Sequence, residues 1–411
     1  GGNLFDLTVN GNALFDASGL GGDSTLGPGG EAGGGLAQIT VATDETTIAI
    51  TGNATLQATA TGGSGTSTGP AATATGGEAL LSLISASFVD IGGVLITDAS
   101  AQGGVNFGTG AGGDAIGGAR AFVFVDNNGI LTVGDDYIAN ASANGGTGIG
   151  GGNAFGGVAG AQVLVGSIDF QNNVTVDAVA TGGDSTSQGG FGGDGGDGFG
   201  GLALVAAQGT QTEVGSIAIA GQATLLANGF GGMGGTGSVD VVPAGRGGDG
   251  YAGTFNTSIV ADDNETGGAR LIAGGDNGQL TVGGGSLLNA VGTGGVGGNG
   301  DLDQSGGDGG DGFGGFAQAG AVLLGTDGSV GAGTVNLNDV SVLAGANGGG
   351  GGFGGSTGDP QGNGGRSMQT PARSLLAMSQ RRLLLSAATA LMAARAKAAT
   401  APALPPTPAV R

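Results

Sequence analysis

A short strip of glycine, an acidic residue, a second glycine and an aromatic residue recurs along this chain. Its three full copies are Gly196-Asp197-Gly198-Phe199, Gly248-Asp249-Gly250-Tyr251 and Gly310-Asp311-Gly312-Phe313. Looser copies place the polar residue at Glu31, Glu78, Asp114 and Asn153, so that the unit repeats every 36 to 62 residues. Self-similarity at periods of this size is typical of repeat architectures, and it constrains the fold more than any other feature.

Three short segments with the pattern of β-strands follow each strip. Alternation of apolar and polar residues with a period of two, bounded by Gly and Asn, is typical of strands. The first, apolar-rich segments are at 36–42, 80–85, 119–125, 159–165, 202–207, 255–260 and 316–324. The second segments are at 48–50, 130–133, 168–170, 217–219 and 280–282. The third segments are at 54–60, 138–143, 174–180, 223–227, 287–291 and 340–344.

Three short strands per unit, repeated seven or eight times, predict an all-β fold. We expect a right-handed β-solenoid, also called a parallel β-helix, whose coils stack about 4.8 Å apart and carry long Gly-rich loops. The inward positions are mostly Ala, Val, Ile and Leu, as a narrow interior requires. A β-sandwich is the structural alternative, because many short strands with turns also describe one. The sandwich leaves the repeated strip unexplained.

Glycine supplies 104 of the 411 residues, and much of it lies in tracts between the third segment and the next strip. Examples are 189–201, 294–300, 306–315 and 348–355. These tracts are either mobile loops or extended polyproline-II-type strands that lie side by side, since Gly at nearly every third position permits close backbone packing. The sequence leaves both alternatives open.

Composition changes sharply near Gly365. We expect a Gly-rich solenoid domain over 1–365 and a tail over 366–411 that is rich in Ala, Leu, Arg and Pro, with a helix at 374–398 and an extended end at 399–411. The tail also has the basic start, apolar middle and small-x-small end of a secretory signal. Its apolar part is too short to span a bilayer. A strand begins within the first nine residues without a preceding Met, so we expect a fragment of a longer protein.

Charge is divided unevenly along the chain. All 32 acidic residues precede Gly365, where Arg120, Arg246 and Arg270 are the only basic residues. A region this acidic repels nucleic acid phosphates and anionic membranes, and it attracts divalent cations. We therefore expect no nucleic-acid partner and no membrane span. The same acidity suits a soluble rod exposed outside the cell.

The residue inventory argues against catalysis. The chain has no His and no Cys, which removes the commonest general base and thiol chemistry. Its one Lys, Lys397, lies in the tail, so no phosphate-binding loop with Lys is present in the repeat region. A carboxylate pair could hydrolyse glycosides, but no pair stands out, and with no Trp and two Tyr there is little surface for sugar stacking. We expect that the protein is not an enzyme.

Two glycine tracts match the calcium-binding nonapeptide pattern G-G-x-G-x-D-x-U-x. They are 192–200 and 306–314, which makes Asp197 and Asp311 the candidate metal ligands and calcium the candidate ion. Each copy stands alone rather than in tandem. The structural alternative is that the Asp residues of the strips cap a turn while the aromatic residues that follow stack in register on successive coils; the residues concerned are Asp197, Asp249, Asp311, Phe199, Tyr251 and Phe313.

Segments such as Gly129-Ile130-Leu131-Thr132-Val133 and Gly278-Gln279-Leu280-Thr281-Val282, each followed by a small-residue strand, carry a resemblance. Over residues 3–345 the chain resembles the β-strand-repeat exoproteins of Gram-negative bacteria, namely filamentous haemagglutinin-like adhesins and autotransporter passengers. The Gly-rich insertions depart from their compact coils and are similar to the tracts of mycobacterial Gly-rich surface proteins. The resemblance implies a secreted bacterial surface protein that works in adhesion, coating or spacing.

Three hypotheses on function follow. The first is a structural or adhesive surface protein whose partners are its own copies or surface polymers and proteins. The second is a calcium-dependent extracellular binding module. The third, ice binding, needs a regular Thr array, and Thr40, Thr47, Thr132 and Thr281 are scattered rather than laddered.

Overall fold

The computed structural model describes residues 5–186, 192–237, 244–253, 267–300, 305–322, 333–354 and 367–368. The chain divides into two compact units, Gly1–Arg373 and Ser374–Arg411, and every described residue belongs to the first. The tail helix expected at 374–398 and the extended end at 399–411 lie outside the described residues. No helix suited to crossing a bilayer occurs in the described ranges.

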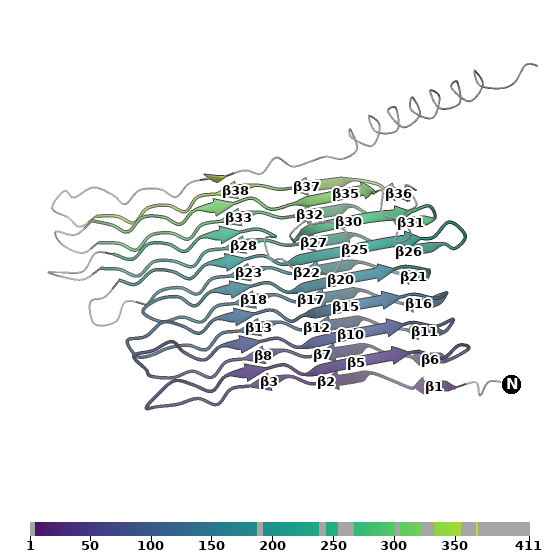
Figure 1. Ribbon diagram of the computed structural model, residues 1–411, viewed down its shortest axis with the longest axis horizontal. Helices are drawn as coiled ribbons and strands as arrows, with labels where there is room; N and C mark the ends of the chain where they lie inside the picture. The colour runs from purple at the N-terminus through teal and green to yellow at the C-terminus, as the bar shows by residue number, and fades with distance from the viewer. Residues whose placement is uncertain are drawn as a thin grey trace, which may run out of the picture. The chain divides into compact units, whose positions relative to one another are not determined.

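The first unit is a parallel β-solenoid, which confirms the predicted fold class. Its strands form five sheets of seven or eight strands each, and every pairing between coils is parallel and in register. We number the sheets I to V in the order in which the chain visits them in each coil. Figure 1 shows the coils stacked one on the next, with the colour advancing through the stack from purple to yellow-green.

Sheets I, II and V contain the longer strands. Sheet I consists of β1 (Asp6–Val9), β6 (Thr47–Ile50), β11 (Phe88–Ile91), β16 (Gly129–Val133), β21 (Gly166–Phe170), β26 (Gly215–Ile219), β31 (Gly278–Val282) and β36 (Thr334–Leu337). Sheet II consists of β2 (Ala13–Asp16), β7 (Ala54–Gln57), β12 (Leu95–Asp98), β17 (Tyr137–Asn140), β22 (Val174–Asp177), β27 (Ala223–Leu226), β32 (Ser286–Asn289) and β37 (Val340–Leu343). Sheet V consists of β5 (Leu36–Val41), β10 (Glu78–Leu83), β15 (Arg120–Val125), β20 (Val158–Val163), β25 (Leu202–Gly209), β30 (Gly268–Gly275) and β35 (Ala317–Ala321).

Sheets III and IV contain strands of two residues. Sheet III consists of β3 (Gly19–Leu20), β8 (Ala60–Thr61), β13 (Ala101–Gln102), β18 (Ala143–Asn144), β23 (Ala180–Thr181), β28 (Gly229–Phe230), β33 (Gly292–Thr293) and β38 (Ala346–Asn347). Sheet IV consists of β4 (Ala32–Gly33), β9 (Ala74–Thr75), β14 (Ala115–Ile116), β19 (Ala154–Phe155), β24 (Gly198–Phe199), β29 (Gly250–Tyr251), β34 (Gly312–Phe313) and β39 (Ser367–Met368). Each coil therefore has two short strands besides the three that were predicted.

The hydrophobic core lies between sheets I, II and V. Alternation sends every second side chain inward, as in β5, where Ala37, Ile39 and Val41 are buried and the residues between them are exposed. Strand pairing in register then stacks like positions into columns, so the core is continuous from coil to coil. Its largest members, Tyr137 and Phe170, stack with ring centroids 5.0 Å apart.

Beyond this core the coil narrows. Sheets III and IV face each other through Ala residues in the earlier coils, including Ala101, Ala115 and Ala143. In the later coils Gly takes these positions, for example Gly229 in β28 and Gly250 in β29. Small residues are required because the two layers of backbone approach closely: a Cβ added to Gly250 would lie 2.1 Å from the carbonyl oxygen of Thr293.

Two predicted assignments are wrong. The loose copy of the strip was placed at Glu78, but Glu78 begins β10, and it is Ala74–Thr75 that pairs with Ala115–Ile116 in sheet IV. The first segment expected at 255–260 lies outside the described residues, and the sheet V strand of that coil is instead β30, Gly268–Gly275.

Candidate functional site

The glycine tracts beyond sheets III and IV form an ordered layer, which we call the glycine layer. In each coil an outgoing tract leaves sheet III and a returning tract leads back to sheet IV. The N–H of Gly248 donates to the carbonyl of Gly232 (2.9 Å), and the N–H of Gly232 donates to that of Gly196 (2.8 Å). The same ladder, in which each residue donates to the one before, runs through Gly104, Gly113, Gly146, Gly152, Gly183, Gly196, Gly232, Gly248, Gly295, Gly310 and Gly349. Of the two alternatives left open by the sequence, side-by-side packing is therefore the one found in these described tracts.

The layer repeats every three residues along each tract. A second ladder lies three residues further out, through Gly193, Gly235, Gly245, Gly298, Gly307 and Gly352. In the tracts of the later coils, two of every three positions have no room for a side chain. A Cβ on Gly247 would lie 2.0 Å from the carbonyl oxygen of Gly295 in the opposite tract, and one on Gly248 would lie 2.0 Å from that of Gly196 in the preceding coil. The period of three is that of polyproline II, where Gly permits the same close approach.

The third position of each triplet points outward and is often Asp or Asn. Around Asp249 all three amides of a triplet find acceptors. The N–H of Gly247 donates to the carbonyl of Asp308, and that of Gly248 donates to Gly232. The N–H of Asp249 donates to the Oδ1 of Asp197 in the preceding coil at 2.7 Å. Because buried amides must be paired, the Asp side chains belong to the scaffold.

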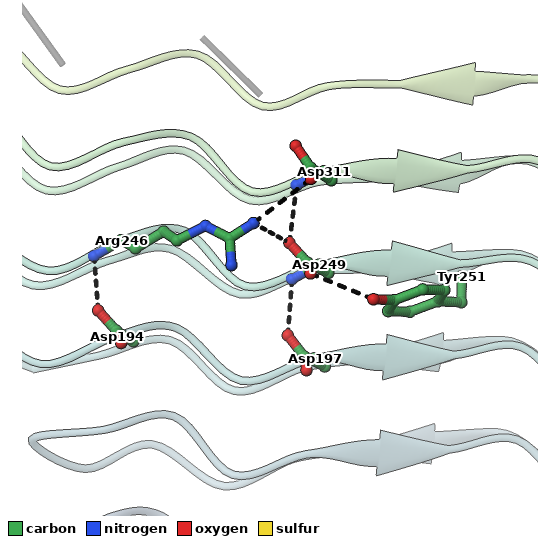
Figure 2. A network of polar contacts seen from close by, with 6 residues as sticks. All are labelled: Asp194, Asp197, Arg246, Asp249, Tyr251 and Asp311. Atoms are coloured by element: carbon green, nitrogen blue, oxygen red, sulfur yellow. Dashed lines mark hydrogen bonds and ion pairs between the residues drawn. The ribbon is translucent and has the colours of Figure 1, made fainter. Parts of the chain in front are cut away.

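Four Asp residues and one Asn form a column across successive coils, which we call the aspartate column. Its members are Asp114, Asn153, Asp197, Asp249 and Asp311. Each side chain accepts the backbone N–H of the next member, at distances of 2.8, 2.9, 2.7 and 2.8 Å in that order. Figure 2 shows the last three members in line. Asp197 and Asp249 therefore do accept backbone amides, as the capping alternative predicted, but from the next coil rather than within a turn.

The aromatic residues of the strips stack beside the aspartate column. Ring centroids are 4.9 Å apart for Phe155 and Phe199, 4.7 Å for Phe199 and Tyr251, and 4.3 Å for Tyr251 and Phe313, with the rings within 6° of parallel. The predicted stacking of these residues in register is confirmed. The spacing is set by the distance between paired strands, which is about 4.8 Å.

Arg246 neutralises part of the aspartate column (Figure 2). Its Nη2 lies 2.6 Å from the Oδ1 of Asp249 and 3.7 Å from the Oδ2 of Asp311. Its backbone N–H donates to the Oδ1 of Asp194 at 2.7 Å. A cation of the chain itself thus lies between two of the carboxylates.

The pKa values of Asp197, in the column, and of Tyr251, beside it, are both raised. Burial raises the pKa of Asp197, against the hydrogen bond from the N–H of Asp249, and the Asp249 carboxylate raises it further. Burial and the charge of Asp249 together raise the pKa of Tyr251 to about 12. The Tyr251 hydroxyl donates to the Oδ2 of Asp249 at 3.2 Å.

The two predicted metal ligands, Asp197 and Asp311, occupy the same column but are not adjacent. Asp249 lies between them, and both Asp197 and Asp249 already accept a backbone amide. Among the described residues no group of three or more acidic side chains lies close enough together to hold a metal ion. The packing of the glycine layer accounts for the nonapeptide glycines, since Gly195, Gly196, Gly309 and Gly310 all lack room for a Cβ. Calcium binding stays a prediction.

Comparison with known proteins does not assign the chain to a family. No family model matches the chain, and no curated protein and no solved structure matches it either.

Proposed function

We propose that this chain is a secreted or surface-exposed structural or adhesive repeat protein that acts through the side faces of its coils and carries out no catalysis. The observation that supports this most is the scaffold itself. Five sheets and the glycine layer hold the same positions in register from coil to coil. Outward residues are therefore presented in columns at intervals of about 4.8 Å. Such a surface suits many weak, repeated contacts.

Surface chemistry supports the same proposal. The repeat region is strongly acidic, which favours solubility and disfavours sheet-edge aggregation in a rod exposed to solvent. The partners we propose are other copies of the chain and the polymers or proteins of a surface. Outward columns of sheet I mix Thr with other residues, as in Thr132, which pairs with Asp90 and Asp169, so no continuous Thr array supports ice binding.

A deletion of one whole coil tests the proposal. Ala74 and Ala115 are equivalent positions of sheet IV, so removing residues 74–114 and joining Thr73 to Ala115 takes out one complete repeat. Binding of the full chain to itself and to polysaccharide-coated and protein-coated surfaces is measured by surface plasmon resonance. We expect measurable binding that weakens modestly in the deletion variant, whose circular dichroism shows an intact β fold. Complete loss of binding with an intact fold would instead indicate a single localised site, and no binding by the full chain would contradict the proposal.

A further inference from the structure

The outer face of sheet V is more apolar than the outer faces of sheets I and II, where residues such as Asp90, Thr132 and Asp98 alternate with single apolar side chains. It carries a second apolar cluster made of Phe122, Val158, Leu202, Leu204, Ala206 and Ile272. These residues are outward by register, because their neighbours along the strands, such as Ala121 and Val123, belong to the central core. The six side chains are only 1 to 5% exposed, so they pack together as a second, smaller core on the outer side of sheet V.

A hollow of about 250 Å³ opens in this face. It is lined by Phe122, Phe124, Val158, Gln162 and Arg120. One of the lining residues, Phe122, pairs with Gly160, which pairs with Leu204 on its other side. Since Gly160 has no side chain, the outer surface is missing one at the centre of the apolar cluster.

Arg120 gives the hollow its charge. Among the described residues the chain has three cations, and two have partners: Arg246 pairs with Asp249, and Arg270 donates to the Oε1 of Gln318 and lies 5.6 Å from the Phe316 ring centroid. The Arg120 side chain makes no hydrogen bond or ion pair with any described residue, although its backbone takes part in β15. Its register neighbours on the outer face are Val158 and Glu78, and no ion pair joins Glu78 to it.

A guanidinium without an ion-pair partner among the described residues, beside two phenylalanine rings, matches one kind of ligand. Arg binds a carboxylate through parallel N–H donors, and the apolar wall favours a ring. A volume of about 250 Å³ lies just below the range of drug-sized pockets, so it fits a single ring rather than an extended molecule. We propose that the hollow on sheet V is a binding site for a small aryl carboxylate, in which Arg120 holds the carboxylate while Phe122, Phe124 and Val158 hold the ring.

The test is isothermal titration of the full chain with 3-phenylpropanoate. The site predicts saturable binding at one site per chain, in the millimolar range expected of so small a ligand. It also predicts affinity at least about tenfold weaker for the neutral 3-phenylpropanol, which cannot engage the guanidinium. Equal affinity for acid and alcohol, or no binding up to about 10 mM, would overturn the proposal.

Variants locate the site. We expect Arg120→Gln to weaken binding of 3-phenylpropanoate about tenfold, and Phe124→Ala to weaken it by a smaller factor. Glu78→Gln removes the carboxylate that lies beside Arg120 on the neighbouring strand, so it should strengthen binding. Arg246→Gln makes the same charge change in the aspartate column and serves as the control; an equal loss in Arg246→Gln and Arg120→Gln would overturn the assignment. All four positions lie outside the central core, and an unchanged circular dichroism melting curve verifies folding.

A parallel titration separates two sources of the ligand. N-acetylphenylalanine presents the same ring and carboxylate as the end of a peptide chain, whereas 3-phenylpropanoate is a free acid. Both compounds are expected to bind through Arg120. Tighter binding of N-acetylphenylalanine would indicate a peptide end as the ligand, and tighter binding of 3-phenylpropanoate would indicate a free acid. Binding of either that persists unchanged in Arg120→Gln contradicts the site.

Discussion

The interiors of two regions of the coil are packed in opposite ways. Between sheets I, II and V, side chains such as Leu81, Leu131 and Phe170 fill the interior and are fully buried. In the glycine layer of the later coils, Gly occupies the inward positions and backbone carbonyls approach the α-carbons directly. The first region is stabilised by what its side chains contribute, and the second by the absence of side chains. The two should therefore respond in opposite directions to changes in side-chain size.

The largest effect is expected from shortening a core side chain. Leu131→Ala in β16 should lower the free energy of unfolding by about 2 to 5 kcal/mol, because it removes buried apolar atoms and leaves a cavity. Urea denaturation measures the change. The adjacent Ile130 is 44% exposed, so Ile130→Ala is the matched control and should cost much less. Equal losses in the two variants would contradict the assignment of the inward face.

Enlarging a residue of the glycine layer should have the next largest effect. A Cβ on Gly151 would lie 1.8 Å from the carbonyl oxygen of Gly183, so Gly151→Ala forces the two tracts apart and should cost about 1 to 3 kcal/mol. Gly150, its neighbour, would place a Cβ no closer than 3.6 Å to Ala111, at ordinary contact distance. Gly150→Ala should be neutral, or stabilising by up to about 1 kcal/mol through the unfolded chain. If both variants lost stability alike, the triplet rule would be wrong.

A smaller effect is expected from the aspartate column. Asp249 accepts the N–H of Asp311 and pairs with Arg246, so Asp249→Ala should cost about 0.5 to 1.5 kcal/mol. Asp249→Asn keeps the acceptor for the amide and should recover part of the loss. Thermal melts of the two variants measure the difference. If Asp249→Asn were as unstable as Asp249→Ala, the stabilisation would come from the charge of Asp249 rather than from its hydrogen bond to the Asp311 amide.

Stability should rise as the pH falls from neutral. Burial raises the pKa of Asp177 and of Asp197 above the ordinary value of 3.8, in the case of Asp177 against the hydrogen bond from the N–H of Val179. When folding raises the pKa of a group, the protonated form of that group favours the folded state. The resulting stabilisation is complete below the pKa of the unfolded chain, and it is lost as the pH rises through the pKa of the folded protein. The melting temperature should rise modestly as the pH is lowered from 7 to 3.8. In the double variant Asp177→Asn, Asp197→Asn, this rise should be smaller.

Calcium should have the smallest effect on folding. The Asp197 and Asp249 carboxylates already accept backbone amides, and Arg246 supplies a positive charge to the same column. We therefore expect the same melting curve for residues 1–365 in millimolar calcium and in chelator. A β signal that forms only with calcium would restore Asp197 and Asp311 as metal ligands and favour the calcium-dependent module.

The strands of the core region were largely predictable because alternation is visible wherever large apolar residues mark one face. Segments such as 48–50, 168–170 and 223–227 coincide with β6, β21 and β27. Prediction failed where that mark is missing. Ala74–Thr75 has no aromatic residue, so the strip was placed five residues late at Glu78. In a later coil a long insertion separates Tyr251 from β30, and an apolar run inside it was chosen instead.

The glycine layer was predictable in kind but not in detail. Gly at nearly every third position indicated close packing, yet Gly is also abundant in mobile linkers. Only the positions of the facing carbonyls distinguish the two. The same ambiguity produced the nonapeptide match, since Gly-Gly-Asp triplets satisfy both a calcium loop and this layer. The hollow on sheet V gave no sequence signal, because it depends on which outward residues of β15 and β20 lie side by side.

Hydrogen–deuterium exchange at the ladder glycines of the glycine layer tests the central claim most directly. Gly152, Gly196 and Gly248 donate their amides across the layer, whereas mobile glycine loops would leave them open to solvent. An ordered layer predicts exchange slowed to rates near those of core strands such as β16 and β21. Exchange at these glycines as fast as in an unfolded peptide, with the core strands protected, would contradict the backbone-packed layer.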